Sequence, residues 1–305
     1  MSKLKVAISY LVYPLTMAGY FVRAFERRDD VELWTVGPYT GAYIPWMHGM
    51  FLPSRYVKAP NCPLPSSLAN AHPPFASVRK DMPWTPDLFL MIDAGWHFVD
   101  RPDGDVVARI QTDPHVLKDF YKYNRALIDY EFCMQSPYME EGEYYLPYGY
   151  DPTIFYPMDL EKEFDACLIG LQYPQRTAWV DRLRARNLKV HYSTGAIYDE
   201  NREIYNKSKL ALSWSTLIDL PARVWEGLAM KLPVVTNRVP DLNKFFKEGE
   251  HYAGFSTVEE AEKQCLLLLA DDEKRDKMAE AGYNAVLPHT WDARVQTILE
   301  TCGLV

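Results

Sequence analysis

A cation and a carboxylate lie three residues apart near the start of a helix that the sequence predicts in the second half of the chain. Pro221 suits the first position of this helix, where its missing N–H costs nothing. Arg223 and Glu226 then share one face of the first turns. With the unpaired backbone amides of a helix N-terminus, they predict a binding site for an anion. The alternative is an exposed ion pair on an ordinary amphipathic helix, which would stabilise little.

Gly170 and Arg176 form a second candidate for anion binding. Gly170 ends a strand predicted over residues 165–170, and Arg176 opens a helix predicted over residues 176–186. A glycine at such a turn lets the backbone approach a phosphate, and an arginine at the start of the next helix can pair with it. The alternative is a simple turn from strand to helix.

Asp113 and His115 are candidates for proton transfer. They follow a strand predicted over residues 106–111, in the sequence Thr-Asp-Pro-His. A carboxylate or an imidazole there can act as a base on a hydroxyl group, and histidine titrates near neutral pH. Asp93, at the end of the strand predicted over residues 87–93, is a further candidate. For Asp113 the alternative is a turn that caps the next helix.

Metal and other catalytic motifs are missing from the sequence. No group of His, Cys, Asp and Glu residues has the spacing of metal ligands, and Asp103 and Asp105 flank a glycine in what is interpreted as a turn. Neither the Gly-x-Ser-x-Gly motif of serine hydrolases nor a P-loop motif is present. The five scattered cysteines indicate reduced thiols in a cytoplasmic protein.

Composition is that of a soluble globular protein, with 48% hydrophobic and 24% charged residues in 305. The net charge of −8 is spread over both halves without a basic block, which argues against nucleic acid as the main partner. No apolar run reaches about 18 residues, so no membrane span is expected. The first residues predict a strand and no signal peptide.

Two series of alternating strands and helices position the candidate residues. The strands are predicted over residues 4–9, 32–36, 87–93, 106–111, 130–134, 165–170, 189–193, 210–213 and 232–235. The helices are predicted over residues 18–28, 116–124, 176–186, 199–207, 221–229, 257–269, 272–286 and 291–301. Such alternation indicates an α/β fold with two parallel, doubly wound sheets, whose ligands bind beyond the carboxyl ends of the strands.

Domain boundaries follow from the prolines near mid-chain. Residues 145–157 hold three prolines and one glycine and are interpreted as the link between two Rossmann-like domains. We expect an N-terminal domain over residues 1–147, a C-terminal domain over 148–290, and a last helix within 291–305 that crosses back to the N-terminal domain. Residues 37–86 show no readable pattern and are long for a structureless loop, which favours a functional role.

Several motifs of the C-terminal half resemble group 1 glycosyltransferases of the GT-B fold, and most closely the CgeB-like branch, also called spore maturation protein-like. The motifs are Leu146-Pro-Tyr-Gly-Tyr-Asp-Pro-Thr-Ile-Phe-Tyr-Pro157, Gly227-Leu-Ala-Met230, Pro233-Val-Val-Thr236, Pro240-Asp-Leu242, Phe245-Phe246, Glu248-Gly-Glu-His251, Ala281-Gly282, His289-Thr-Trp291 and Arg294. The resemblance covers residues 146–300 well and residues 1–145 only in architecture.

The resemblance implies a donor site for a nucleotide-sugar, with a UDP-sugar as the expected substrate and no metal or other cofactor. Gly170 and Arg176 match positions that bind the diphosphate, and Glu226 matches the acid that binds the ribose. The family has an arginine where this chain has Leu171, and we expect Arg223 to supply that contact. Gly19 matches a glycine near the donor phosphates.

The mechanism of transfer is less well specified by the resemblance. The wider family's second glutamate falls at Ile218, with Asp219 one residue away, so retention of configuration does not follow. Asp93, Asp113 and His115 are then the candidates that act on the acceptor hydroxyl or stabilise the positive charge developing on the sugar.

Other functions remain open on the sequence alone. A nucleotide-sugar epimerase on the same fold would turn over the donor without an acceptor, and a non-catalytic relative would bind a nucleotide-sugar or a partner as a scaffold. For a transferase the acceptor stays open among a glycan, a protein and a small molecule. A narrower variant, a phage-type enzyme that acts on a modified DNA base, fits the acidic composition poorly.

Overall fold

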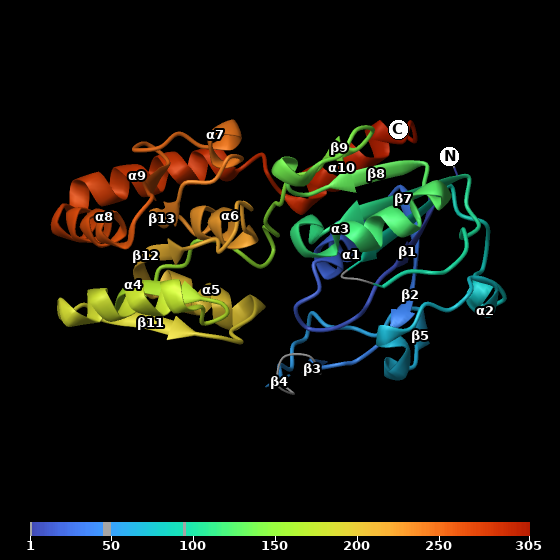
Figure 1. Cartoon of the computed structure of the whole chain (residues 1–305), viewed down its shortest axis with the longest axis horizontal. Helices are drawn as coiled ribbons and strands as arrows, with labels where there is room; N and C mark the ends of the chain where they lie inside the picture. Colours follow the sequence, from blue (N-terminus) through green and yellow to red (C-terminus); the bar gives the residue numbers. More distant parts are fainter. Residues whose placement is uncertain (1, 45–49, 94–95) are drawn as a thin grey trace. The chain divides into compact units, whose positions relative to one another are not determined.

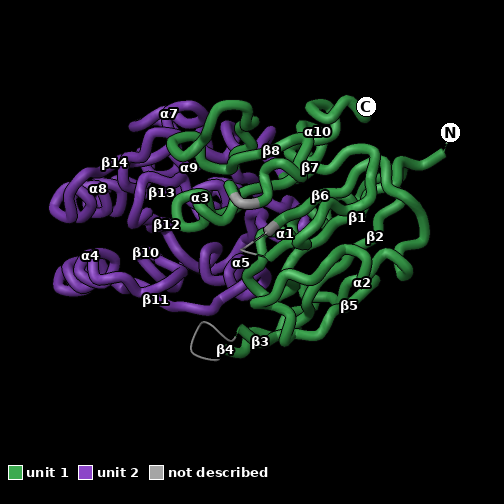
Figure 2. Tube along the Cα trace, turned by 45° about the vertical axis from the view of Figure 1, so that its right-hand side comes forward, with its two compact units in different colours: residues 1–147, 291–305 green, residues 148–290 purple. Residues whose placement is uncertain are grey.

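The chain folds into two compact units, each built around a parallel sheet. The structure is a computed structural model that describes residues 2–44, 50–93 and 96–305. Unit 1 comprises Met1–Pro147 and Trp291–Val305, and unit 2 comprises Tyr148–Thr290 (Figure 2). The predicted α/β fold with two parallel sheets is confirmed.

Unit 1 is built on a seven-stranded sheet in the order β5-β2-β1-β6-β7-β8-β9, in which all neighbours run parallel (Figure 1). Its strands are β1 (Leu4–Ser9), β2 (Val31–Pro38), β5 (Cys62–Leu64), β6 (Leu88–Asp93), β7 (Val106–Gln111), β8 (Tyr130–Cys133) and β9 (Tyr144–Tyr145). The central strands are nearly continuous apolar runs, as a sheet covered on both faces requires.

The helices of unit 1 include one from the far end of the sequence. They are α1 (Ala18–Glu26), α2 (Ala76–Arg79), α3 (Pro114–Tyr123) and α10 (Trp291–Thr301). Trp291 of α10 is buried against α1, with its ring 5.5 Å from Tyr20 and 4.9 Å from Phe21. Asp292 also pairs with Arg27 at 2.7 Å. These contacts attach α10 to a helix that precedes it by more than 260 residues.

The unreadable segment over residues 37–86 contains short elements and no long helix among its described residues. They are β3 (Tyr43–Ile44) and β4 (Met50–Phe51), which pair antiparallel, followed by β5, a 3-10 helix over Ser66–Asn70 and α2. β5 pairs with β2 at the edge of the main sheet, through Val36 and Cys62. Strands of two or three residues carry no hydrophobic period, which is why the sequence pattern missed them.

Unit 2 has a five-stranded parallel sheet in the order β11-β10-β12-β13-β14. Its strands are β10 (Phe164–Ile169), β11 (Val190–Ser193), β12 (Ser208–Ser213), β13 (Val234–Asn237) and β14 (Tyr252–Phe255). Its helices are α4 (Pro174–Ala185), α5 (Tyr198–Asn206), α6 (Ala222–Ala229), α7 (Leu242–Phe245), α8 (Val258–Ala270) and α9 (Asp272–Val286).

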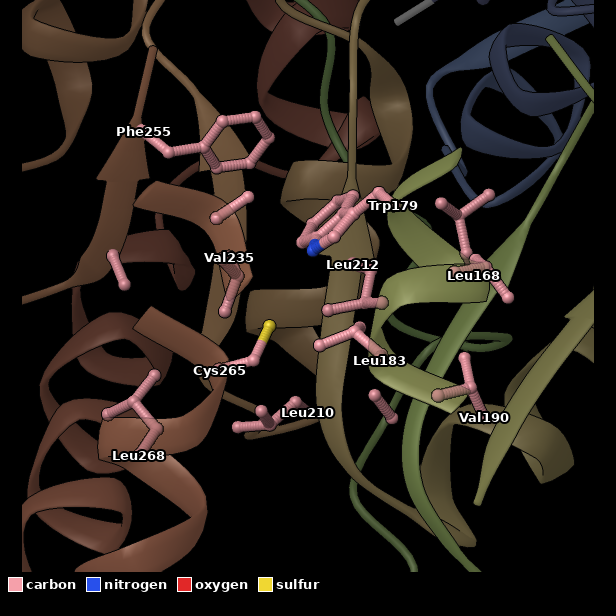
Figure 3. Packing of buried hydrophobic residues seen from close by; sticks show 14 of the residues in the cluster. Leu168, Trp179, Leu183, Val190, Leu210, Leu212, Val235, Phe255, Cys265 and Leu268 are labelled. Atoms are coloured by element: carbon pink, nitrogen blue, oxygen red, sulfur yellow. The ribbon is translucent and has the colours of Figure 1, made fainter. Parts of the chain in front are cut away.

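One hydrophobic core of unit 2 lies between its sheet and helices α4 and α8 (Figure 3). Trp179 of α4 is fully buried, with its ring 4.9 Å from that of Phe255. Leu212 and Val235 extend from the strands into the same cluster, and Cys265 comes from α8. This packing fixes the carboxyl ends of β10 and β12, where the candidate residues follow.

The start of α6 differs from the prediction. Pro221 has extended backbone angles (φ −76°, ψ 152°) and lies just before the helix, so that the first helical residue is Ala222. A proline fixes φ but leaves ψ free, so it fits the position before the helix as well as the first one in it. Among the described residues, no helix has both the length and the apolar character needed to cross a membrane.

Candidate functional site

Gly170 directly follows β10 and has a backbone conformation that favours glycine, with φ at +144°. Its N–H donates to the carbonyl of Ser193, and its own carbonyl accepts from Thr194 Oγ1 at 3.0 Å. A Cβ built on Gly170 would lie 3.2 Å from Arg223 Nη2 and 3.5 Å from Arg176 Nη1. The glycine therefore allows two guanidinium groups to gather beside one stretch of backbone.

Arg176 lies in the first turn of α4, buried, and holds two loops together. Its Nε and Nη2 donate to the carbonyl of Trp214 at 2.8 and 2.6 Å, and its Nη1 donates to the carbonyl of Leu171 at 2.9 Å. Burial, and secondarily the charge of Arg223, lowers the pKa of Arg176 to about 10. The side chain remains a cation at neutral pH, but protein carbonyls already use three of its N–H groups.

Arg223, unlike Arg176, has a buried guanidinium nitrogen that is not hydrogen-bonded within the described residues. It lies in the first turn of α6, half-buried, and its Nη1 is buried with no hydrogen-bond partner among the residues that the structure describes. A buried, unsatisfied donor on a charged group is costly unless a ligand completes it. The guanidinium that carries this unsatisfied donor lies next to Gly170.

Glu226 lies one turn further along α6, with 8% of its surface exposed. Because Glu226 is buried, it does not fit the alternative of an exposed surface ion pair. The pKa of the buried Tyr205 hydroxyl is raised, mainly by burial, and the negative charge of Glu226 contributes to this rise. Asp219 is half-buried and accepts a hydrogen bond from Ser215 Oγ, whereas Ile218 is 47% exposed.

These four residues lie within unit 2 and combine complementary functions. Arg176 and Arg223 provide two positive charges beside the Gly170 backbone, and Glu226 provides a buried carboxylate on the same helix as Arg223. Such a set can hold a diphosphate by charge-assisted hydrogen bonds and accept hydrogen bonds from a diol. No cluster of His, Cys, Asp and Glu that could bind a metal occurs among residues 2–44, 50–93 and 96–305.

The proton-transfer candidates lie in unit 1, at the carboxyl ends of adjacent strands. Asp93 is the last residue of β6, paired in register with Gln111 of β7, and its side chain lies outside the described part of the structure. Asp113 precedes α3, but its carboxylate caps no helical N–H and accepts from Thr112 Oγ1 at 2.8 Å. The expected alternative, a side-chain cap by Asp113, is therefore wrong, because the neighbouring hydroxyl takes its Oδ2.

His115 occupies the first turn of α3 and is half-buried. Its ring lies 5.9 Å from that of Tyr138, and its Nδ1 is buried without a hydrogen-bond partner in the described residues. The nearby Asp113 forms no ion pair with a basic side chain among the described residues. Both side chains thus keep the chemical capacity for proton transfer.

Gly19 lies in unit 1 on α1, whereas Gly170, Arg176, Arg223 and Glu226 lie in unit 2. It lines a pocket of about 290 Å³ together with residues of β2 and of the segment after the β3–β4 hairpin. This pocket was not evident from the sequence, and the assignment of Gly19 to donor binding stays a prediction.

A buried ion pair in unit 1 was missed entirely. Arg109 of β7 and Glu131 of β8 are neighbours in register, and their side chains form an ion pair with 0% and 5% exposure. Arg109 Nε donates to Glu131 Oε1 at 2.7 Å, and Arg125 approaches the second carboxylate oxygen at 3.6 Å. The only signal in the sequence is a pair of opposite charges inside two successive strands.

Comparison with known proteins supports the GT-B fold and the transferase character of the second half. The model of a family described as glycosyl transferase-like matches residues 153–300, so this part of the chain is a glycosyl transferase-like domain. No curated protein sequence matches the chain.

Solved structures resemble the whole chain at low sequence identity. HepE of Anabaena, in complex with UDP-glucose, superposes with a TM-score of 0.67 at 9% identity, over 99% of this chain and 100% of HepE. Sucrose-phosphate synthase of Thermosynechococcus elongatus gives 0.62 at 13% identity, over 98% of both chains. A Listeria monocytogenes protein, provisionally described as a UDP-N-acetylglucosamine 2-epimerase, gives 0.57 at 13% identity over 98% and 95%. The fold is therefore GT-B.

Proposed function

We propose that this protein is a glycosyltransferase that moves a sugar from a nucleoside diphosphate-sugar, with UDP as the nucleotide, to an acceptor hydroxyl. The observation that carries the proposal is the open, buried Nη1 of Arg223 beside Gly170, within reach of a second guanidinium on Arg176. The family match over residues 153–300 and the UDP-glucose complex of HepE support the choice of donor.

The donor site would work mainly by stabilising the leaving diphosphate. When the bond between sugar and phosphate breaks, negative charge grows on the phosphate oxygens, and preorganised cations lower the barrier. In this proposal Arg223 would donate directly to the diphosphate, while Arg176 would add its charge and keeps the loops after β10 and β12 in place. Because arginines and helix amides supply the positive charge, the proposed reaction needs no metal ion.

Glu226 is proposed to bind the ribose of the nucleotide. A carboxylate offers two acceptor oxygens to neighbouring hydroxyl groups, and the burial of Glu226 strengthens such hydrogen bonds. Its position one turn after Arg223 sets the ribose contact at a fixed offset from the phosphate contact along α6.

Unit 1 is proposed to supply the acceptor and the base. Asp93, Asp113 and His115 follow strands β6 and β7 and remain the candidates for that base. His115, with an unpartnered Nδ1 among the described residues, and Asp113 can each accept a proton from a hydroxyl. Membership of the CgeB-like branch is part of the proposal.

The test is a calorimetric titration with UDP, UDP-glucose, UDP-N-acetylglucosamine and GDP-mannose. Arg223→Ala should weaken binding of the preferred nucleotide by about 10- to 100-fold, because a charge-assisted hydrogen bond contributes about 1.5–3 kcal/mol. Arg186→Ala is the matched control, since Arg186 lies in the same unit with 60% of its side chain exposed, and it should bind like the wild type. Absence of nucleotide binding by the wild type would contradict the proposal.

The same reaction mixtures separate a transferase from its alternatives. A transferase releases UDP faster when an acceptor is present, and Glu226→Ala slows that release. An epimerase would convert the donor to its epimer with no acceptor, and a scaffold would bind the nucleotide without any turnover. Either of these two results would replace the proposed activity.

A further inference from the structure

The pocket that Gly19 lines belongs wholly to unit 1. One wall is a single face of α1, formed by Gly19, Val22, Arg23 and Glu26, which follow the i, i+3, i+4, i+7 spacing of a helix. The remaining lining residues are Tyr10, Thr35, Tyr56, Lys58, Ala59 and Asn61. All ten of its lining residues come from unit 1, whereas the four residues to which we assign donor binding come from unit 2.

The chain topology explains why space remains beside α1. Between β2 and β5 the described residues form a short hairpin and irregular backbone, with no helix to cover the sheet next to α1. Tyr56, Lys58, Ala59 and Asn61 line the pocket in place of such a helix. The resulting volume of about 290 Å³ is close to the lower end of small-molecule sites, which range over about 300–1,000 Å³.

Hydrogen bonds join two residues of the pocket lining, Thr35 and Asn61. Thr35 is buried, and both its N–H and its hydroxyl donate to Asn61 Oδ1 at 2.9 Å. The Asn61 N–H in turn donates to Thr35 Oγ1 at 3.0 Å. With its carbonyl oxygen used in this way, the Asn61 side chain presents its amide NH2 as a donor, and no partner for that NH2 occurs among the described residues.

Two cations and one carboxylate line the pocket. Arg23 lies over the rings of Tyr20 and Tyr56, at 4.7 and 5.5 Å from their centroids, so its guanidinium is held in place by aromatic faces. Lys58 and Glu26 are exposed, and neither forms an ion pair in the described part of the chain. The lining thus carries an excess of one positive charge and keeps one carboxylate available as an acceptor.

We propose that this pocket binds a monosaccharide that carries an anionic group, either a phosphate or a carboxylate. Arg23 and Lys58 would pair with the anionic group, and Glu26 and the Asn61 amide would bind ring hydroxyls as acceptor and donor. Tyr10 and Tyr56 add aromatic surface, which suits the apolar faces of a sugar ring. An inorganic anion alone would leave Glu26 and most of the volume unused.

The test is calorimetric titration of the full chain with glucose 6-phosphate, glucuronate, glucose and inorganic phosphate. At least one of the two anionic sugars should bind at least about tenfold more tightly than glucose and than inorganic phosphate. The two anionic sugars distinguish a phosphate from a carboxylate as the preferred group. This binding should weaken as salt is added, because exposed charges are screened.

Three variants assign the binding to this pocket. Lys58→Ala removes a cation, and Ala59→Trp fills the volume from an exposed position without removing any lining group. Each should weaken binding of the anionic sugar by about tenfold or more, while Lys80→Ala, an exposed lysine of unit 1 outside the pocket, should not. Equal melting temperatures of the variants exclude unfolding as the cause.

Two results would overturn the inference. One is that neither anionic sugar binds in the millimolar range; the other is that inorganic phosphate binds as tightly as the sugars do. Nucleotide titration of Arg223→Ala reports separately on the donor site of unit 2, so failure of either proposal leaves the other measurable.

Discussion

Arg176 and Arg223 lie on the same side of Gly170, so that a single Cβ added at that glycine would contact a guanidinium nitrogen of each. The positive charges of Arg176 and Arg223 repel each other. The nearby Asp219 carboxylate raises the pKa of Arg176, but this effect is a minor one. An anion bound between the two guanidinium groups would relieve this repulsion. The relationship therefore links a backbone feature, a glycine with φ of +144°, to the affinity for a phosphate group.

Gly170→Ala should reduce nucleotide binding by about tenfold or more, because the new Cβ displaces Arg223 from its position. It should also lower the melting temperature, since an L-residue is strained at this φ. Gly249→Ala is the matched control in the same unit, with φ at +81° and no atom within 4 Å of the new Cβ. It should share the loss of stability but bind the nucleotide normally. Equal nucleotide affinities for the two variants would contradict the assignment of Gly170.

Ser213→Ala should leave the free energy of unfolding unchanged or raise it slightly. Ser213 ends β12 with 1% exposure, and its hydroxyl has no hydrogen-bond partner among the described residues. Removing an unsatisfied buried hydroxyl has little cost. Ser208→Ala is the comparison, because this equally buried hydroxyl donates to the Ile204 carbonyl at 2.8 Å, and its loss should cost about 1 kcal/mol. Urea denaturation of both variants measures the difference, and an equal loss in both would be contrary to this expectation.

Glu131→Ala should destabilise unit 1 by about 3–5 kcal/mol, because it leaves the Arg109 guanidinium buried without its counter-ion. Replacing both residues with methionine should recover much of that loss, since a well-packed apolar pair avoids the buried charge. Asp103→Asn serves as the control: it breaks an ion pair with Arg79 whose side chains are 49% and 41% exposed, and it should cost less than about 1 kcal/mol. Chemical denaturation provides the values. If the double variant were as unstable as Glu131→Ala, the buried charge would not be the cause.

Glu260 should make unit 2 sensitive to acid. Its carboxylate accepts hydrogen bonds from Arg238 and from the Ser256 N–H, which lower its pKa to about 2 from 4.5. A carboxyl whose pKa is depressed by folding stabilises the fold above its unfolded pKa, and this contribution is lost as the pH falls from 4.5 to about 2. Glu260→Gln should therefore show a shallower loss of melting temperature over this range.

The control for this pH profile is Glu259→Gln. Glu259 is adjacent in sequence, with 65% of its side chain exposed and one ion pair at 3.3 Å to Arg182. Its replacement should leave the slope of melting temperature against pH as in the wild type. Parallel profiles for Glu260→Gln and the wild type would exclude Glu260 as a source of the acid sensitivity.

The alternating architecture could be predicted because each sheet consists mainly of buried parallel strands. Runs such as residues 88–92 are apolar throughout, and a strand covered on both faces needs such a run. Residues 37–86 could not be predicted, because β5 owes its place to pairing with β2 and not to any pattern of its own. Local sequence carries little information about such non-local pairing.

Part of the candidate site could be predicted from the sequence. Gly170, Arg176, Arg223 and Glu226 follow recognisable turns between strand and helix, and these turns meet at one edge of the sheet. The sequence did not indicate which hydrogen bonds the arginine N–H groups form within the protein. That Arg176 is committed to the Trp214 and Leu171 carbonyls depends on how the loops fold back, which only the tertiary structure specifies.

The location of α10 has a consequence for the order in which the two units mature on the ribosome. Unit 2 is continuous and has all its residues once Thr290 has been synthesised, whereas unit 1 begins the chain yet lacks a buried part of its core until Trp291 and Ile298 have emerged. The half that is translated first is therefore the half that finishes folding last. Until then, the α1 surface that receives Trp291, including Phe21, stays open to solvent and to chaperones.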